Sequence, residues 1–145
     1  MKVLCLNCQV LNEPQAGRDL CSLIRREKPS LVFLSETKLH SAATKSLIEK
    51  VLAGKEREFF GTYVDVRMSS GGAALLWLQD IQVMLLSKSS NHVDVEIDGG
   101  DDEPNSRFIG VYGWPETQNK LKTCELLRYL KPHSMQPWLI GGDLN

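Results

Sequence analysis

The 145-residue sequence has no long apolar run and no export signal at its start. Its longest apolar run extends from Ala73 to Leu78, whereas a membrane-spanning helix needs about 20 consecutive apolar residues. The first apolar run, Val3 to Leu6, is interrupted by Asn7 too early for a signal peptide. We therefore expect no membrane partner and an intracellular location.

No charge of one sign predominates either, because 17 Lys and Arg residues stand against 18 Asp and Glu residues. Such a chain has no global field that attracts nucleic acid. The balance does not exclude a nuclease, since one groove can be basic while the far side is acidic. With 42% apolar residues, the chain can form one domain with a substantial core, which we assign to residues 1–145.

The four cysteines do not form a recognisable zinc or redox motif. Cys5 and Cys8 form one C-x-x-C, but Cys21 and Cys124 are isolated, and no His-x-x-x-His is present. A redox C-x-x-C normally begins a helix, whereas this pair lies along a predicted strand, where the two side chains point to opposite faces. We therefore predict small buried thiols at Cys5 and Cys8, which stay reduced in the cell.

The first part of the chain alternates short apolar runs with helical patterns. The runs Lys2–Leu6 and Leu31–Leu34 predict two strands, the second buried on both faces. Pro14 can begin a helix that ends before Pro29, and Ser41 can cap a second helix. The inward side chains of this second helix are predicted to be Leu47, Ile48, Val51 and Leu52. This β-α-β-α order predicts a sheet covered by helices.

The middle of the chain changes to a series of strand-like runs. They are Phe59–Val66, Ala73–Leu78, Ile81–Leu86, Val93–Ile97 and Arg107–Tyr112. Residues 69–72 predict a turn, and residues 118–130 predict a helix before a last buried strand at Trp138–Ile140. Acidic residues between Asp94 and Glu103 predict a strand with one wet face and a solvated hairpin, in preference to a cation site. The result is a mixed α/β fold.

Polar residues follow the predicted strands at the points where the strands end. They are Asn7, Glu36, Tyr112, Asp143 and Asn145. In an open α/β sheet, ligands bind beyond the carboxyl ends of the strands. If these strands run side by side in one direction, the five side chains gather on one rim. Two carboxylates and amide oxygens are hard ligands suited to Mg²⁺ or Mn²⁺, so we predict a metal site there.

A metal ion at this rim would screen the charge of a phosphate and polarise a P–O bond. Amide and phenol groups could donate hydrogen bonds to the non-bridging oxygens, and Gly141 and Gly142 would allow a close backbone approach or a sharp turn. Taken singly, each polar residue also fits an ordinary turn, cap or core position, and the prediction depends on all five occurring together. No such setting surrounds the histidines, for which we predict surface or loop positions: His40, His92 and His133.

The blocks that carry these residues resemble the endonuclease/exonuclease/phosphatase superfamily. The resemblance is strongest to the endonuclease domain at the start of plant LINE-type (non-LTR) retrotransposon reverse transcriptase polyproteins. In order along the whole chain, the blocks are LNCQ, LVFLSETK, SGGAALLW, VYGWP and PWLIGGDLN. The resemblance implies the N-terminal portion of a four-layer αββα sandwich of mixed β-sheets. It also implies Mg²⁺-dependent cleavage of phosphodiester bonds, with DNA as the partner.

The same resemblance implies a role for each rim residue. Glu36 would bind the metal, with Asn7 beside it, and Tyr112 would contact the phosphate. Asp143 would orient or activate the attacking water, and Asn145 would help to fix that water and the phosphate. In a retrotransposon, a nick in genomic DNA, made in the nucleus, would prime reverse transcription.

The sequence departs from the family pattern in several places. Val10 and Asn12 stand where the family usually has glycines, and Leu144 replaces an aromatic residue. The family domain usually continues for roughly another hundred residues, which supply much of the second sheet and a catalytic histidine. The resemblance therefore predicts a C-terminally truncated domain with little or no turnover. It also predicts self-association through the sheet face left uncovered.

Two alternatives to a nicking endonuclease remain open. The chain could be another phosphoesterase of the superfamily, such as a repair endonuclease, a deadenylase or an inositol-phosphate phosphatase. It could also be a catalytically inactive retrotransposon remnant or an interaction module, which the truncation, Val10 and Leu144 favour. The blocks at residues 70–72 and 112–115 favour the retrotransposon branch.

Overall fold

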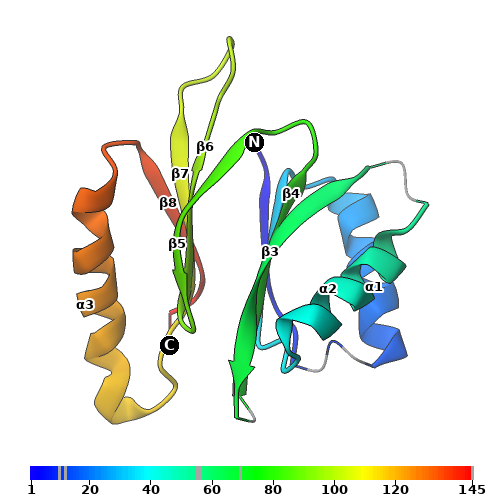
Figure 1. Cartoon of the computed structure of the whole chain (residues 1–145), viewed down its shortest axis with the longest axis horizontal. Helices are drawn as coiled ribbons and strands as arrows, with labels where there is room; N and C mark the ends of the chain where they lie inside the picture. The colour runs from blue at the N-terminus through cyan, green and yellow to red at the C-terminus, as the bar shows by residue number, and fades with distance from the viewer. Residues whose placement is uncertain (10, 12, 55–56, 69, 145) are drawn as a thin grey trace.

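A computed structural model describes the chain except for residues 10, 12, 55–56, 69 and 145. Its elements form four layers, with helices outside and two sheets inside (Figure 1). The first sheet has the order β1-β2-β4-β3, from Val3–Asn7, Leu31–Ser35, Ser70–Leu78 and Phe59–Arg67. The second has the order β5-β6-β7-β8, from Val83–Ser89, His92–Ile97, Ser106–Tyr112 and Trp138–Asp143. The helices are α1 (Pro14–Glu27), α2 (Ser41–Leu52) and α3 (Lys120–Leu130), with the 3₁₀ turns η1 (Thr117–Asn119) and η2 (Lys131–His133).

The two sheets pack face to face over one apolar core. Phe33 and Leu75 of the first sheet meet Val95 and Phe108 of the second. The rings of Phe33 and Phe108 lie edge to face, with centroids 6.2 Å apart. The second sheet therefore already covers the inner face of the first within this chain. The expectation of an uncovered sheet face is wrong, because residues 83–143 supply four strands of the second sheet.

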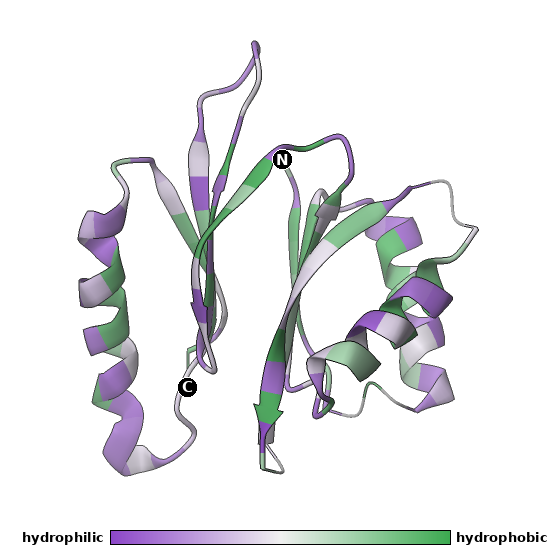
Figure 2. Cartoon of the chain, in the orientation of Figure 1, coloured by the Kyte–Doolittle hydropathy of each residue, from purple (hydrophilic) through white to green (hydrophobic). Residues whose placement is uncertain are grey.

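The helices cover the outer faces of the sheets. Leu20 and Ile24 of α1 and Ile48 of α2 pack on the first sheet, and Leu130 of α3 packs on the second. Figure 2 shows the apolar faces of these helices directed at the sheets. Because both of its faces are covered, every residue of β2 is buried, as its continuous apolar run predicts. No helix within the described part of the chain is long and apolar enough to cross a membrane.

The start of α2 differs from the predicted cap. The helix begins at Ser41, with His40 at the N-cap position and without a cap from its own side chains. The Ser41 N–H donates instead to Oδ1 of Asp65 on β3, at 2.6 Å. This hydrogen bond is the main cause that lowers the pKa of Asp65, and it supplies the negative group that a helix N-terminus favours. The predicted cap is wrong because the capping group comes from another element.

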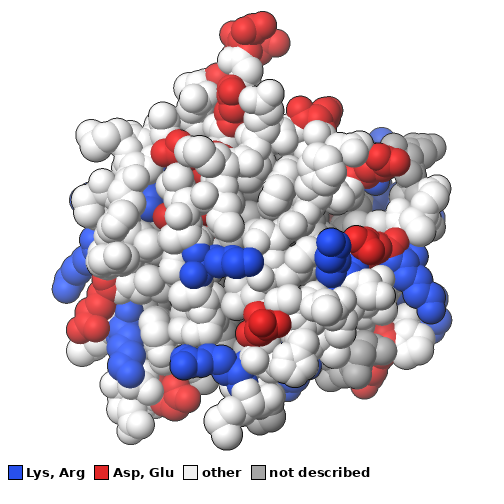
Figure 3. Space-filling view, viewed as in Figure 1, with Lys and Arg blue, Asp and Glu red and all other residues white. Residues whose placement is uncertain are grey.

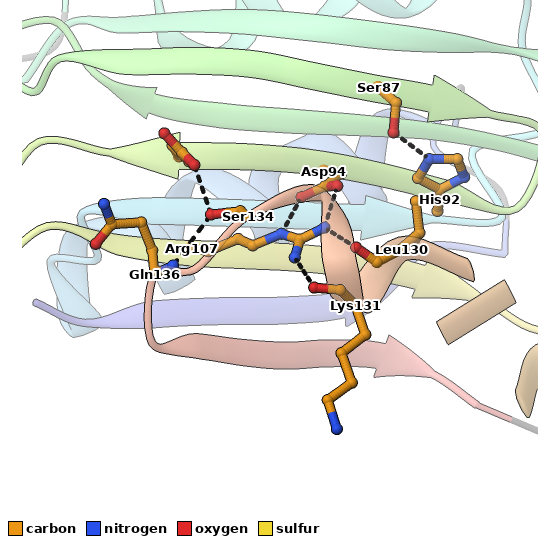
Figure 4. A network of polar contacts seen from close by, with 9 residues as sticks. Ser87, His92, Asp94, Arg107, Leu130, Lys131, Ser134 and Gln136 are labelled. Atoms are coloured by element: carbon orange, nitrogen blue, oxygen red, sulfur yellow. Dashed lines mark hydrogen bonds and ion pairs between the residues drawn. The ribbon is translucent and has the colours of Figure 1, made fainter. Parts of the chain in front are cut away.

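A buried ion pair corrects the prediction of a wet face on β6. Asp94 is fully buried, and Arg107 of the neighbouring strand is 1% exposed. The guanidinium donates to both carboxylate oxygens at 2.8 and 2.7 Å, and also to the carbonyls of Leu130 and Lys131 (Figure 4). A carboxylate can lie under α3 only because Arg107 compensates its charge. The hairpin tip is solvated, as predicted: Asp98, Asp101, Asp102 and Glu103 are exposed.

His92 is also more buried than predicted, whereas His40 and His133 are exposed. The His92 ring lies between two hydroxyls, with Ser87 2.8 Å from one nitrogen and Ser89 2.7 Å from the other. Burial lowers the pKa of His92; the charge of Asp94 partly opposes this effect, and the charge of Arg107 adds to it. The loop prediction is wrong because these two serines satisfy both ring nitrogens at the start of β6.

The last strand is less buried than its apolar sequence predicts. β8 is the edge of the second sheet and pairs with β7. Its side chains remain open to solvent, with Trp138 36% and Leu139 52% exposed. An apolar run predicts a strand, but it does not distinguish an edge from the centre of a sheet.

The two cysteines near β1 differ in their exposure. Cys5 is exposed, against the prediction of a buried thiol. Burial raises the pKa of Cys8 to about 11.

Candidate active site at the carboxyl ends of the strands

Parallel pairing brings the predicted rim residues together, although through two sheets instead of one. β1 and β2 are parallel, and so are β7 and β8, which places Asn7 beside Ser35 and Tyr112 beside Asp143. The two pairs meet across the sandwich. Nδ2 of Asn7 donates to Oδ2 of Asp143 at 3.5 Å, and the Tyr112 hydroxyl donates to Oε1 of Glu36. Four of the five predicted residues therefore form one group, and Asn145 lies outside the described residues.

Glu36 occupies an unusual backbone conformation, which the neighbouring hairpin maintains. Its φ of 57° lies in the left-handed region, which costs a residue with a side chain free energy. The next two N–H groups, of Thr37 and Lys38, donate to the carbonyls of Gly72 and Gly71 at 3.2 and 3.0 Å. Gly72 has φ +81°, and a side chain there would collide with Thr37. The two glycines therefore fix the turn that carries Glu36.

This use of Gly71 and Gly72 corrects the sequence prediction for residues 69–72. β4 begins at Ser70, so the glycines belong to a strand and not to the turn. Residue 69 lies outside the described residues. The glycines are needed because the backbone of β4 approaches the turn of Glu36 closely. The sequence alone does not predict this contact between two distant segments.

The Glu36 carboxylate has two neighbours at the rim. Its Oε1 accepts the hydrogen bond from Tyr112, and its Oε2 lies 3.8 Å from Nζ of Lys38. Burial raises the pKa of Tyr112, and the hydrogen bond and negative charge of Glu36 raise it further. The phenol therefore remains a hydrogen-bond donor at neutral pH. Sequence reasoning missed Lys38, although it stands in the same LVFLSETK block as Glu36.

Two glycines allow Asp143 to reach this group. A side chain at Gly141 would lie 2.7 Å from Sγ of Cys5, and one at Gly142, whose φ is +118°, would lie 2.9 Å from the Phe33 ring. These approaches bring the end of β8 against β1 and β2. The predicted close approach before Asp143 is therefore confirmed, and it explains how Asp143 meets Asn7 across the two sheets.

A groove of about 140 Å³ opens beside Tyr112. Its lining includes Arg67, Ser70, Trp114 and Glu116. Two larger hollows, of about 380 and 610 Å³, lie over α1, α2 and β3, and none of the rim residues lines them. This small groove therefore shares Tyr112 with the rim, while Asn7, Glu36 and Asp143 are not among its lining residues.

The donor atoms at the rim fit a magnesium ion better than a zinc ion. The described residues contain no group of three or more acidic, histidine or cysteine side chains placed to hold a metal. A structural or catalytic zinc site requires such a group. Magnesium is usually held by one or two carboxylates and keeps several waters, and the Glu36 carboxylate and the Asn7 amide oxygen are donors of the kind that it takes.

Comparison with known proteins gives one family match and a set of related folds. Residues 3–145 match the model of the "Endonuclease/Exonuclease/phosphatase family". No curated protein matches the chain by sequence. Similar solved structures include the endonuclease domain of TRAS1, a telomere-specific non-LTR retrotransposon (16% identity, TM-score 0.68). Others are the AP endonuclease LMAP from Leishmania major (12%, 0.67) and the 3′ phosphatase NExo from Neisseria bound to product DNA hairpin (16%, 0.63).

These matches extend over almost all of this chain but only part of the others. They cover 98%, 98% and 99% of this chain, and 59%, 54% and 57% of the three similar chains, respectively. At such low identity the likeness shows the fold alone. It confirms the predicted αββα arrangement of mixed sheets.

Proposed function

Because the chain belongs to the endonuclease/exonuclease/phosphatase family, we propose that its rim hydrolyses phosphodiester bonds in nucleic acid with a divalent metal ion. The observation that carries this proposal is the meeting of two pairs of polar residues from different sheets. Glu36 accepts a hydrogen bond from Tyr112, and Asp143 accepts one from Asn7. Such a convergence of carboxylates, an amide and a phenol suits phosphate chemistry.

Each rim residue has a role in the proposed reaction. Glu36 and Asn7 would hold Mg²⁺ or Mn²⁺, and the ion would screen the phosphate charge and polarise a P–O bond. Tyr112, whose phenol stays protonated, donates to a non-bridging oxygen as negative charge develops there. Asp143 accepts a hydrogen bond from the attacking water and so orients it. The family pattern gives Asn145 the task of fixing that water and the phosphate.

We propose DNA as the substrate, cut by nicking as in the LINE-type branch. The groove beside Tyr112 supports a polynucleotide, since Arg67 can contact a neighbouring phosphate and Trp114 can stack on a base. Lys and Arg are interspersed with Asp and Glu on the face in Figure 3, so binding depends on local contacts and not on a global field. Among the similar structures are a retrotransposon endonuclease domain and a phosphatase bound to a DNA hairpin. A genomic DNA substrate implies a nuclear site of action.

The proposed domain comprises residues 1–145 as part of the family architecture, and these residues alone should act slowly. Within the described part of the chain, the side-chain hydrogen bonds and ion pair of Asn7, Glu36 and Tyr112 involve no histidine. General acid–base groups that act as a unit do not lose activity gradually when one is missing. We therefore expect slow turnover from the 145-residue chain.

Nicking of supercoiled plasmid DNA tests the proposed function. We expect the 145-residue chain to convert supercoiled to open-circular DNA slowly in Mg²⁺ or Mn²⁺ and to stop when EDTA removes the metal. A preparation of the Asp143→Asn variant, purified in the same way, controls for contaminating nucleases. Equal nicking with and without EDTA would contradict a metal-dependent site.

We also propose self-association of the isolated chain, through the edge strand β8 instead of the uncovered face expected from the sequence. β8 pairs with β7 on one side, and its Leu139 side chain is 52% exposed. An open strand edge with apolar side chains favours pairing with a second chain. Light scattering should detect dimers or larger species in the wild type and fewer in Leu139→Lys. The matched control is Leu121→Lys on α3, where Leu121 is 75% exposed; an equal effect of both changes would contradict the role of β8.

A further inference from the structure

One residue of the turn between β5 and β6 satisfies both backbone groups of Tyr112. The Tyr112 N–H donates to the backbone carbonyl of Asn91 at 2.9 Å. The side-chain Nδ2 of Asn91 donates to the Tyr112 carbonyl, also at 2.9 Å. The regular pairing of β6 with β7 ends at His92 and Val111, so Asn91 extends the contact by one residue beyond the ladder. It does so at the residue that carries the catalytic phenol.

The turn that presents Asn91 is itself fixed by side-chain hydrogen bonds. The Asn91 N–H donates to Oγ of Ser89 at 3.1 Å, and the Ser90 hydroxyl donates to Oδ1 of Asn91 at 3.1 Å. Because Oδ1 accepts from Ser90, the amide nitrogen is directed toward Tyr112. The Ser89 hydroxyl also contacts the buried ring of His92 at 2.7 Å. The Asn91 amide therefore has one preferred orientation, which suits a positioning role.

We infer that Asn91 is a positioning residue that holds the Tyr112 phenol against Glu36. The phenol can reach Glu36 across the sandwich only if the end of β7 is fixed, and Asn91 fixes both polar groups of that backbone unit. Asn91 acts through Tyr112 and has no proposed contact with the metal. This role rests on the proposed function, because it matters for catalysis only if Tyr112 contacts the phosphate. Displacement of a positioned group by about 1 Å can reduce a rate about 100-fold.

Tyrosine-selective NMR tests the geometric part of this inference without requiring turnover. The chain has three tyrosines, so protein labelled with ¹³C at the phenol carbon gives three signals: Tyr63, Tyr112 and Tyr129. In Asn91→Ala, we expect the Tyr112 signal to move toward its position in Glu36→Gln, while the other two signals stay unchanged. Asn91→Asp keeps the size of the side chain but removes the donor, and it should move the same signal. The unchanged signals also establish that the variants are folded.

A matched control lies in the hairpin at the other end of β6. Oδ1 of Asn105 accepts the Gly99 N–H at 3.1 Å, so Asn105→Ala also removes an asparagine that supports a hairpin. We expect this variant to leave the Tyr112 signal in place. An unmoved Tyr112 signal in both Asn91 variants, or an equal movement in Asn105→Ala, would overturn the inference.

Kinetics separate a failure of this inference from a failure of the proposed function. With plasmid DNA, Asn91→Asp should lower kcat about tenfold and leave KM within about twofold, since positioning affects the transition state more than binding. Wild-type nicking with an unchanged kcat in Asn91→Asp would overturn the positioning role alone. Absence of wild-type nicking would count against the proposed function, and the NMR comparison would still decide whether Asn91 holds Tyr112.

Discussion

Substitution of Glu36 by glutamine should reduce Mg²⁺-dependent nicking by at least about 100-fold, which is the upper range for loss of a group that merely supports a metal ligand. The carbonyls of Gly71 and Gly72 hold the turn that carries Glu36, and the Tyr112 phenol donates a hydrogen bond to the Glu36 carboxylate. Glutamine keeps the volume but loses the charge. It also turns an NH₂ group, which cannot bind a cation, toward the rim. The nicking rate on supercoiled plasmid, followed over time, measures the effect.

The matched control for this prediction is Glu49→Gln on α2. Glu49 is 65% exposed and its carboxylate lies 4.0 Å from Nζ of Lys45, so it resembles Glu36 in having a lysine neighbour. It lines a hollow over α2 and β3 that no rim residue lines. The same chemical change there should leave the nicking rate unaltered. Comparable losses in both variants would mean that Glu36 acts only through the overall charge or stability of the chain.

Substitution of Asp94 by alanine should destabilise the chain by about 3–5 kcal/mol, the range for breaking one side of a buried ion pair. The Arg107 guanidinium would lose the acceptors of two hydrogen bonds at 2.8 and 2.7 Å. It would remain charged at a position that is 1% exposed, under the end of α3. Its contacts with the Leu130 and Lys131 carbonyls do not compensate the charge. Chemical unfolding followed by circular dichroism measures the change.

Two comparisons isolate the buried charge as the cause. The paired change Asp94→Leu with Arg107→Met removes both charges, and it should cost far less than Asp94→Ala because no uncompensated group remains. Asp102→Ala removes an exposed carboxylate from the hairpin tip and should change the free energy of unfolding by no more than about 0.5 kcal/mol. A loss in Asp94→Ala as small as that in Asp102→Ala would refute the account of this ion pair.

The sequence predicts the elements well because their signals are local. The continuous apolar run at Leu31–Leu34 indicates a strand covered on both faces, and the apolar stripe after Pro14 indicates a helix packed on it. The sequence does not reveal which strands share a sheet. Strand ends indicated a common rim, but the pairing of β1 with β2 and of β7 with β8 in separate sheets depends on contacts between distant residues. The exposed edge position of β8 was missed for the same reason.

The sequence indicates the residues of the proposed site whose own side chains carry chemistry, and it does not indicate the residues that would hold them in position. Asn7, Tyr112 and Asp143 are the last residues of their strands and Glu36 directly follows one, so strand direction brings these residues to a common rim. Asn91 lies in a turn and acts on a residue 21 positions away, which no local pattern indicates. The alternation of acidic and apolar residues led to the wrong prediction of a solvated face at Asp94. The charge of Asp94 is compensated by Arg107, and this partner is found only once β6 is paired with β7.

The most direct test of the rim as a metal-dependent phosphodiesterase site is a single plasmid-nicking series. It compares wild type in Mg²⁺, wild type in EDTA, Glu36→Gln and Glu49→Gln at equal protein concentration. The account predicts open-circular DNA from wild type and Glu49→Gln in Mg²⁺, and none above background from Glu36→Gln or in EDTA. Nicking by Glu36→Gln at the wild-type rate would contradict it.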